Sequence, residues 1–325
     1  MQNHIINRTL IGTFFEYFDF VLFTSAFPVI LVELSHNTSN HMISQLSLFC
    51  ILSSFWLRPI FGYLWGSIAD RYGLGTSINF NLLIMGVGTL LIGLTPAFHN
   101  LFYCLIWVAL ARVVQIIAFS GEFTSSVQII GILDVEKASW LFMATAFGGA
   151  AANGLVSLFE SGLSWRVPFI VSGIILLLSG IVSTPRKIIR APDENHIRAL
   201  IQLFPFALCV ILFQLLPTWI SATDLRIDML WSLIIIALVY ILISSYPQQI
   251  VSITFLIISG ISAISFLFNN HFFFLCICIQ SLVAMTFHTF LIPTSKTMNS
   301  RSFALSYQVA FMLTSGLTSL FSFYL

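Results

Sequence analysis

Charged side chains are scarce in this sequence. Only 8% of its 325 residues are Asp, Glu, Lys or Arg, whereas 58% are hydrophobic and the mean hydropathy is +0.99. A soluble domain carries about 25% charged residues. The chain is too apolar for a water-exposed protein, and we predict an all-α polytopic membrane protein that works in a lipid bilayer. The net charge of +1 gives no basic field, which argues against nucleic acid as a partner.

Motifs of catalysis and metal binding are lacking as well. The sequence contains no HExxH, GxSxG or P-loop pattern, and none of its five cysteines forms a CxxC pair. We therefore expect no enzyme, no metal site and no cofactor. The cysteines lie inside apolar runs, where a small apolar packing residue is the commoner role.

Long apolar runs make up most of the chain, and a spanning helix needs about 20 such residues. Charged or turn residues delimit eleven predicted spans: 10–33, 43–68, 76–97, 101–130, 138–159, 164–184, 199–219, 229–246, 249–268, 272–292 and 302–325. The longest polar connection divides them into six and five. We predict an N-terminal six-helix bundle over 1–184, a cytoplasmic linker over 185–198, and an incomplete C-terminal bundle of about five helices over 199–325.

Basic residues between the spans indicate the orientation. With the N-terminus inside, the cytoplasmic side receives Arg8, Arg71, Lys137, Arg186, Lys187, Arg190, Arg198, Lys296 and Arg301. The opposite side receives Arg226 and, at the membrane edge, Arg166. The positive-inside rule therefore predicts a cytoplasmic N-terminus, and the odd number of spans predicts that Leu325 lies outside.

Two acidic residues lie inside the first predicted span. Glu16 and Asp19 are three residues apart, so their carboxylates share one face of a helix. Because two buried acids repel each other when both are ionised, such a pair can exchange a proton or bind a substrate. The alternative is that Glu16 or Asp19 simply pairs with an arginine for structure.

The fourth span supplies further polar groups. Arg112 and Gln115 lie within one helical turn, and Glu122 follows Gln115 by seven residues on the same face. An intramembrane arginine is a counter-charge for the first-span acids or for an anionic substrate. Alternatively, Arg112 is a permanently paired structural residue. In the second half, a lone histidine such as His288 is more often a hydrogen-bonded packing residue than a proton relay.

The segment 58–73, RPIFGYLWGSIADRYG, interrupts the apolar pattern. Its distinctive residues are Arg58, Gly62, Gly66, Asp70, Arg71 and Gly73. Small residues four apart let two helix backbones approach closely, and Gly73 can end the helix in a left-handed turn. We expect Asp70 to accept hydrogen bonds from a neighbouring helix N-terminus or an arginine, which holds two bundles together in one state. A weak surface ion pair is the alternative.

These segments together resemble the major facilitator superfamily. The sequence GSIADRYG over 66–73 resembles the loop between its second and third helices. Other segments are similar to the metabolite:proton symporter branch, which includes proline/betaine, alpha-ketoglutarate and citrate carriers. They are Gly12 with EYFDF over 16–20, Arg58-Pro59, Arg112 with Gln115 and Gly121-Glu122, WRVPF over 165–169, and RSFALSY over 301–307.

The resemblance implies a major facilitator-like two-bundle fold with a central cavity and alternating access by rocking. It also implies proton-coupled symport of a small polar metabolite by a monomer in a bacterial inner membrane. We place Glu16, Asp19, Arg58, Arg112, Gln115 and Glu122 around the proton-coupling and substrate cavity, and Gly62, Gly66, Asp70, Arg71 and Gly73 in a gating loop. Arg112 suits a carboxylate, whereas Tyr17 suits the quaternary ammonium of an osmolyte.

Several positions depart from the family pattern. Leu74-Gly75-Thr76 replaces the usual basic run after the loop, and Ile116 stands where a glycine is expected. The corresponding second-half segment, SYPQQ over 245–249, has no Asp-Arg pair, and the sequence stops where a twelfth helix would begin. These departures support an alternative prediction, a degenerate and transport-defective membrane paralogue that retains the fold.

Overall fold

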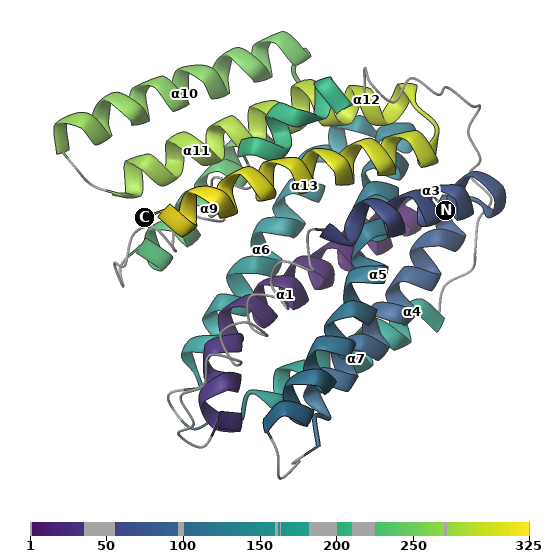
Figure 1. Ribbon diagram of the computed structural model, residues 1–325. Helices are drawn as coiled ribbons and strands as arrows, with labels where there is room; N and C mark the ends of the chain where they lie inside the picture. Colours follow the sequence, from purple (N-terminus) through teal and green to yellow (C-terminus); the bar gives the residue numbers. More distant parts are fainter. Residues whose placement is uncertain are drawn as a thin grey trace.

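The computed structural model describes residues 2–35, 56–96, 101–159, 162, 164–181, 200–209, 225–269 and 272–324, and the regular structure of these residues is helical (Figure 1). The first half contains α1 Gln2–Ser35, α3 Arg58–Tyr72, α4 Leu74–Gly93, α5 Leu101–Leu133, η1 Val135–Lys137, α6 Ala138–Ser157 and α7 Arg166–Ile181. The second half contains a helix over Leu200–Cys209, α9 Leu225–Ile243, α10 Gln248–Asn269, α11 Phe272–Thr286, η2 Phe287–Leu291, α12 Ile292–Thr297 and α13 Ser300–Tyr324.

Each of the eleven predicted spans coincides with a helix in its described residues, which confirms the all-α prediction. The helix ends differ from the predicted bounds. The first helix begins at Gln2 rather than near residue 10, because its polar first turns are held by side-chain contacts such as that of Arg8 with Asn79 of α4. Residues 43–55, 210–219 and the predicted linker 185–198 lie outside the described residues.

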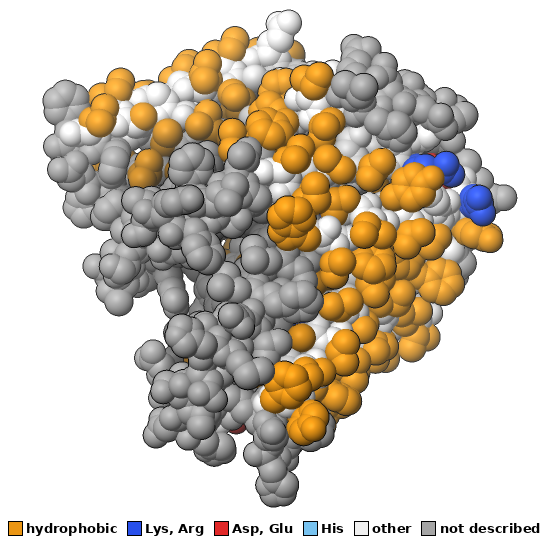
Figure 2. Space-filling model, viewed as in Figure 1, with side chains coloured by type: hydrophobic (Ala, Val, Ile, Leu, Met, Phe, Trp, Pro, Cys, Tyr) orange, Lys and Arg blue, Asp and Glu red, His pale blue; other side chains and the backbone are white. Residues whose placement is uncertain are grey.

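The described helices suit a membrane by length and composition. Five are long and apolar enough to cross one: 5–27, 74–93, 102–133, 248–265 and 273–297. Figure 2 shows hydrophobic side chains spread over much of the described surface, with basic side chains gathered at one edge near the end of α3. The outer face of α10 exposes Ile253, Leu256, Ile264 and Leu267. Such a surface is stable against lipid rather than water, and the chain is an integral membrane protein.

The helices of each half of the chain pack mainly against one another. In the first half, α1 packs against α6 and α5, while α4 lies between α5 and α7. In the second half, α11 packs against α9 and α10. The halves meet where α3 packs against α13, where α6 packs against α9, and where α5 contacts α12 and α13 (Figure 1).

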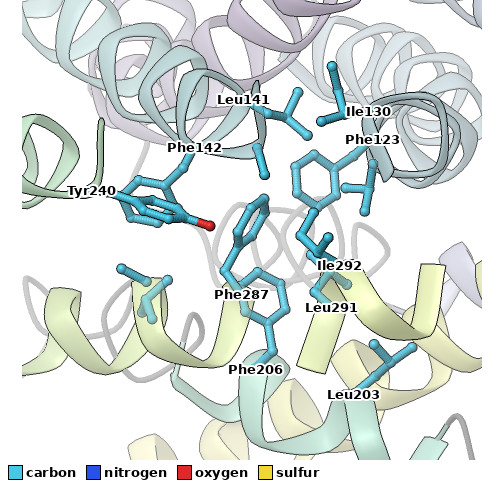
Figure 3. Close-up of a cluster of buried hydrophobic side chains, with 14 of the residues drawn as sticks. Phe123, Ile130, Leu141, Phe142, Leu203, Phe206, Tyr240, Phe287, Leu291 and Ile292 are labelled. Carbon is cyan, nitrogen blue, oxygen red and sulfur yellow. The ribbon is translucent and has the colours of Figure 1, made fainter. Parts of the chain in front are cut away.

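A cluster of buried hydrophobic residues joins the two halves; we call it the interhalf cluster (Figure 3). Phe123 and Phe142 enter it from α5 and α6, and Phe206, Tyr240 and Phe287 enter it from the second half. Phe142 packs edge-on against both Tyr240 and Phe287, with ring centroids 5.7 and 5.8 Å apart. Aromatic pairs of this kind add stabilisation beyond the area they bury. The halves are therefore in direct apolar contact here.

Candidate functional site

Asp19 of α1 is bound into a network of side chains from three helices. The Gln115 side-chain amide on α5 donates to Asp19 Oδ2 at 2.6 Å and to Thr89 Oγ1 of α4 at 2.9 Å. The Arg112 guanidinium donates to Gln115 Oε1 at 2.9 Å. All of these side chains are buried, Asp19 being 2% exposed and Arg112 3%. We call Asp19, Thr89, Arg112 and Gln115 the Asp19 network.

Aromatic rings flank the arginines of the site. The Arg112 guanidinium lies 4.2 Å from the Phe23 ring centre and 5.3 Å from that of Phe20. The Arg58 guanidinium of α3 lies 5.3 Å from the same Phe20 ring and 4.2 Å from Phe119. Cation–π attraction is strongest where the cation is desolvated. Two buried guanidinium groups thus lie within cation–π distance of the one Phe20 ring, which is a favourable setting for an anionic group.

Glu16, the other first-span acid, contacts different partners from Asp19. Its side chain is fully buried, and neither carboxylate oxygen has a hydrogen-bond partner among the described residues. It interacts electrostatically with Glu122 of α5 and with Arg58. Glu122 is also fully buried and accepts a hydrogen bond from Ser126 Oγ at 2.9 Å. The two acids expected to act together on one helix face therefore lie in two separate sets of contacts.

Asp70 meets the first turn of α13. Its Oδ1 accepts a hydrogen bond from the backbone N–H of Ser300 at 2.9 Å, and its Oδ2 accepts one from that of Arg301 at 3.0 Å. The first N–H groups of a helix have no partner within it, so a carboxylate is a natural acceptor for them. The expected hydrogen bonding of Asp70 to a helix N-terminus is confirmed. We call the region where α3 contacts α13 and where α5 contacts α12 and α13 the Asp70 end.

The glycines of the same segment have distinct tasks. A Cβ at Gly62 would lie 2.7 Å from Gln308 Cγ of α13, so close helix packing depends on its absence. Gly73 ends α3 with a φ of 95° and donates its N–H to Ala69 O at 2.9 Å. The positive φ agrees with the expected turn, although its ψ of 152° lies outside the left-handed helical region. Arg71 is exposed to the surroundings.

Further contacts at the Asp70 end were not predicted from sequence. The Gln308 side chain donates to Ser120 O at 2.8 Å, and that of Gln128 donates to Met298 O at 3.4 Å. A Cβ at Gly131 would lie 2.7 Å from Ser295 Oγ of α12. These residues join α5 to α12 and α13. Single Gln and Gly residues in apolar helices carried no signal of their partners, which lie more than 150 residues away.

The described part of the second half has one polar contact between side chains of α9 and η2 that concerns a predicted residue. Tyr240 Oη and His288 Nδ1 are 2.8 Å apart, so His288 has the packing role that was expected to be the commoner one. His288 lies in the π-helical turn η2. The connection from α9 to α10 exposes residues 245–250 and has no counterpart of Asp70. No group of three or more His, Cys, Asp or Glu that could hold a metal occurs in the described part of the chain.

Relatives with related sequences are transport proteins. A Staphylococcus haemolyticus protein named "Putative proline/betaine transporter" is 30% identical over 205 residues, which are 58% of this chain and 43% of that protein. An inner membrane metabolite transport protein of Escherichia coli is 28% identical over 196 residues, covering 54% of this chain and 44% of the relative. The match thus spans less than half the length of these relatives. No family model matches the chain.

Solved structures with a similar fold are also transporters. The major facilitator superfamily proton:xylose symporter XylE, bound to a bromo-deoxyglucose, superposes with a TM-score of 0.68 at 11% identity over 98% of this chain and 87% of that one. A double tryptophan variant of XylE gives 0.62 at 14% identity, with the same coverage. The major facilitator fold and the resemblance to metabolite transporters are therefore confirmed. These relatives are transporters rather than enzymes.

Proposed function

We propose that this chain, with its major facilitator fold, is a secondary active transporter that carries a small polar metabolite together with protons. The Asp19 network is the observation that carries the proposal, because it buries an acid, an amide and an arginine where α1, α4 and α5 meet. Ionisable groups are expensive inside a membrane and usually mark a substrate or proton path. The network joins helices far apart in sequence, so movement of one helix alters the contacts of the others.

The solute we propose is an osmolyte such as proline or betaine, or a carboxylate. Arg58 and Arg112 flank Phe20 and offer two positive charges to a carboxylate. Tyr17 and Phe119, whose ring centroids are 6.2 Å apart, supply aromatic faces for a quaternary ammonium. The name of the Staphylococcus relative supports proline or betaine, and that of the Escherichia relative supports a metabolite of no stated kind.

Alternating access would proceed by rocking of the two halves. In the structure the halves are joined at the Asp70 end by Asp70 and by close packing at Gly62. The interhalf cluster is a further contact between them. We infer that the protein cycles between this arrangement and one in which α3 separates from α13. We further propose that the N-terminus and the Asp70 end face the cytoplasm of a bacterial cell, and that the transporter works as a monomer.

Uptake into proteoliposomes tests the proposal. Purified protein is reconstituted, and accumulation of radiolabelled proline, glycine betaine and alpha-ketoglutarate is followed under an imposed pH gradient. We expect one of them to accumulate, the protonophore-treated sample to lose accumulation, and Asp19→Asn to abolish it. The exposed Glu136→Gln serves as the matched control and should transport normally. Accumulation by Asp19→Asn at the wild-type rate would overturn the assignment of the site.

The second candidate is a transport-defective paralogue that retains the fold. The exposed α9–α10 connection favours it, because this segment lacks the carboxylate that joins the halves at α3. A thermal-shift screen with proline, betaines and dicarboxylates, followed by uptake of each solute that binds, separates the two candidates. A transporter should both bind a solute and accumulate it, whereas the defective paralogue should show no accumulation of any solute that raises its melting temperature.

A further inference from the structure

Glu16 and Glu122 face each other across the contact between α1 and α5. Gly12 precedes Glu16 by one helical turn and lies on the same face of α1. A Cβ at Gly12 would lie only 2.7 Å from Glu122 Oε1, so the Glu122 carboxyl group occupies the space that this glycine leaves open. The two carboxyl groups interact electrostatically, and both side chains are fully buried. They form a buried acid pair.

The charged and titratable groups around this pair come from α1, α3 and α13. Arg58 of α3 acts on Glu16, Arg8 of α1 acts on Glu122, and the phenols of Tyr17 and Tyr307 lie close to Glu16 and Arg58. None of them donates a hydrogen bond to Glu16, whose carboxylate oxygens have no partner among the described residues. The pair therefore has cations nearby and Glu122 accepts a hydrogen bond from Ser126, but Glu16 lacks the donors that normally satisfy a buried carboxylate.

We propose that Glu16 and Glu122 hold one proton between them and that this proton is the one coupled to solute movement. Two ionised carboxylates in contact inside a membrane repel each other strongly, so the pair retains a proton. A hydroxyl on one carboxyl group then donates to the other, which supplies the partner that Glu16 lacks. The hydrogen bond from Ser126 stabilises negative charge on Glu122.

Asp19 is in a different position. One of its oxygens accepts a hydrogen bond from Gln115, and Arg112 acts on it as a counter-charge. Its ionised form is thus supported by a donor and a cation, whereas each acid of the Glu16–Glu122 pair also lies beside a second carboxyl group. The structure therefore separates two tasks that the sequence assigned jointly to Glu16 and Asp19: proton binding at Glu16 and Glu122, and solute binding at the Asp19 network.

The acid pair is linked to the helices that must separate. Arg58 interacts electrostatically with Glu16 and also with Tyr307 of α13. Arg58 begins α3, the helix that carries Asp70 twelve residues later, about 18 Å along its axis. When the pair releases its proton it gains a negative charge that attracts Arg58 toward α1 and α5. Loss of the proton thereby changes the contact between α3 and α13.

Infrared difference spectroscopy tests the proton directly and needs no solute. Spectra of the purified protein in lipid are compared between acidic and alkaline pH for the C=O band of a protonated buried carboxyl group. We expect a titrating band in the wild type, in Asp19→Asn and in the exposed control Glu136→Gln. In the Asp19→Asn background, where this other buried acid cannot titrate, the band should be absent from Glu16→Gln and from Glu122→Gln, because the new amide donates to the remaining carboxylate and keeps it ionised. A band that persists in either Gln variant, or is lost in Asp19→Asn, overturns the proposal.

Two controls keep the result interpretable. Glu16→Asp retains a carboxyl group and should retain the band, and each variant must elute as a monodisperse peak. Coupling is then measured with whichever of radiolabelled proline, glycine betaine or alpha-ketoglutarate the wild type takes up, since the proposal rests on the proposed function. Glu16→Gln and Glu122→Gln should keep solute counterflow and lose at least about tenfold in pH-driven accumulation. Loss of both activities, or of neither, overturns the coupling role, whereas an inactive wild type refutes the proposed function alone.

Discussion

Gly66 of α3 lies directly against the backbone of Arg301 in α13. A Cβ at Gly66 would lie 2.5 Å from Arg301 Cα and 2.7 Å from Ser300 O, which is closer than any side chain allows. Asp70 accepts the two N–H groups of the same turn of α13, one turn further along α3. The halves are therefore joined at the Asp70 end by backbone contact and by a charge at a helix N-terminus, and both features can be tested separately.

Gly66→Ala should weaken this contact. The added methyl group meets backbone atoms that cannot rotate away, and overpacking of this kind costs about 1–3 kcal/mol. Separation of α3 from α13 is measured at position 304, which is buried in α13. The cysteine introduced by Ala304→Cys, in a protein without the native cysteines, reacts with a membrane-impermeant maleimide when it becomes exposed. We expect labelling to rise at least about fivefold. Gly260→Ala, with open space around its Cβ, is the control and should label like the parent.

Asp70→Asn and Asp70→Ala should form a graded pair in the same labelling assay. Asparagine keeps one acceptor oxygen but loses the charge, which is worth about 0.3–1 kcal/mol at a helix N-terminus. Alanine removes both acceptors and should cost about 0.5–2 kcal/mol. Labelling of Ala304→Cys should therefore increase in the order parent, Asn, Ala. The exposed Tyr72→Phe should have no effect, and equal labelling of all variants would contradict the role of Asp70.

Gln115→Ala should disable the Asp19 network. The substitution removes the amide that joins Asp19, Thr89 and Arg112, and leaves the buried Asp19 carboxylate without its Gln115 donor, at a cost of about 1–3 kcal/mol. Thr89→Val removes one interhelical hydrogen bond, that from Gln115, together with the bond that Thr89 donates to Met85 O within α4, and interhelical bonds in membranes average about 0.6 kcal/mol. The melting temperature and the rate of solute uptake should therefore both fall further in Gln115→Ala than in Thr89→Val. A Thr89→Val variant as impaired as Gln115→Ala would refute the central position of Gln115.

Phe287→Ala should loosen the interhalf cluster. Phe287 is 1% exposed and packs against Phe142, Phe206 and Tyr240 (Figure 3). Truncation of a buried Phe costs about 3–5 kcal/mol in a well-packed core. We expect a lower melting temperature together with faster labelling of Ala304→Cys. Phe80→Ala is the matched control, since Phe80 is 52% exposed on α4 and should change neither measurement.

The contact of Asp70 was predictable because it follows from local features. Two glycines four apart, an Asp and a helix-ending Gly make one surface of a helix, and only a helix N-terminus or an arginine satisfies the acid there. The partner itself lies 230 residues away, and its identity came only from the structure. The interaction of Tyr307 in α13 with Arg58 in α3 was not predicted for the same reason, since a tyrosine in an apolar helix gives no sign of the arginine beside it.

The residue pattern alone predicts that this protein is a bundle of membrane helices with ionisable groups inside. Scarce charge leaves no aqueous surface, and apolar runs of spanning length must satisfy their backbone as helices. Which of the buried groups meet depends on how the helices pack, and this required the structure. Glu16 and Asp19 are three residues apart, yet the angle between them directs one toward Glu122 and the other toward Gln115, 96 residues beyond it. Spacing along one helix sets the direction of a side chain, but the packing of the other helices sets its partner.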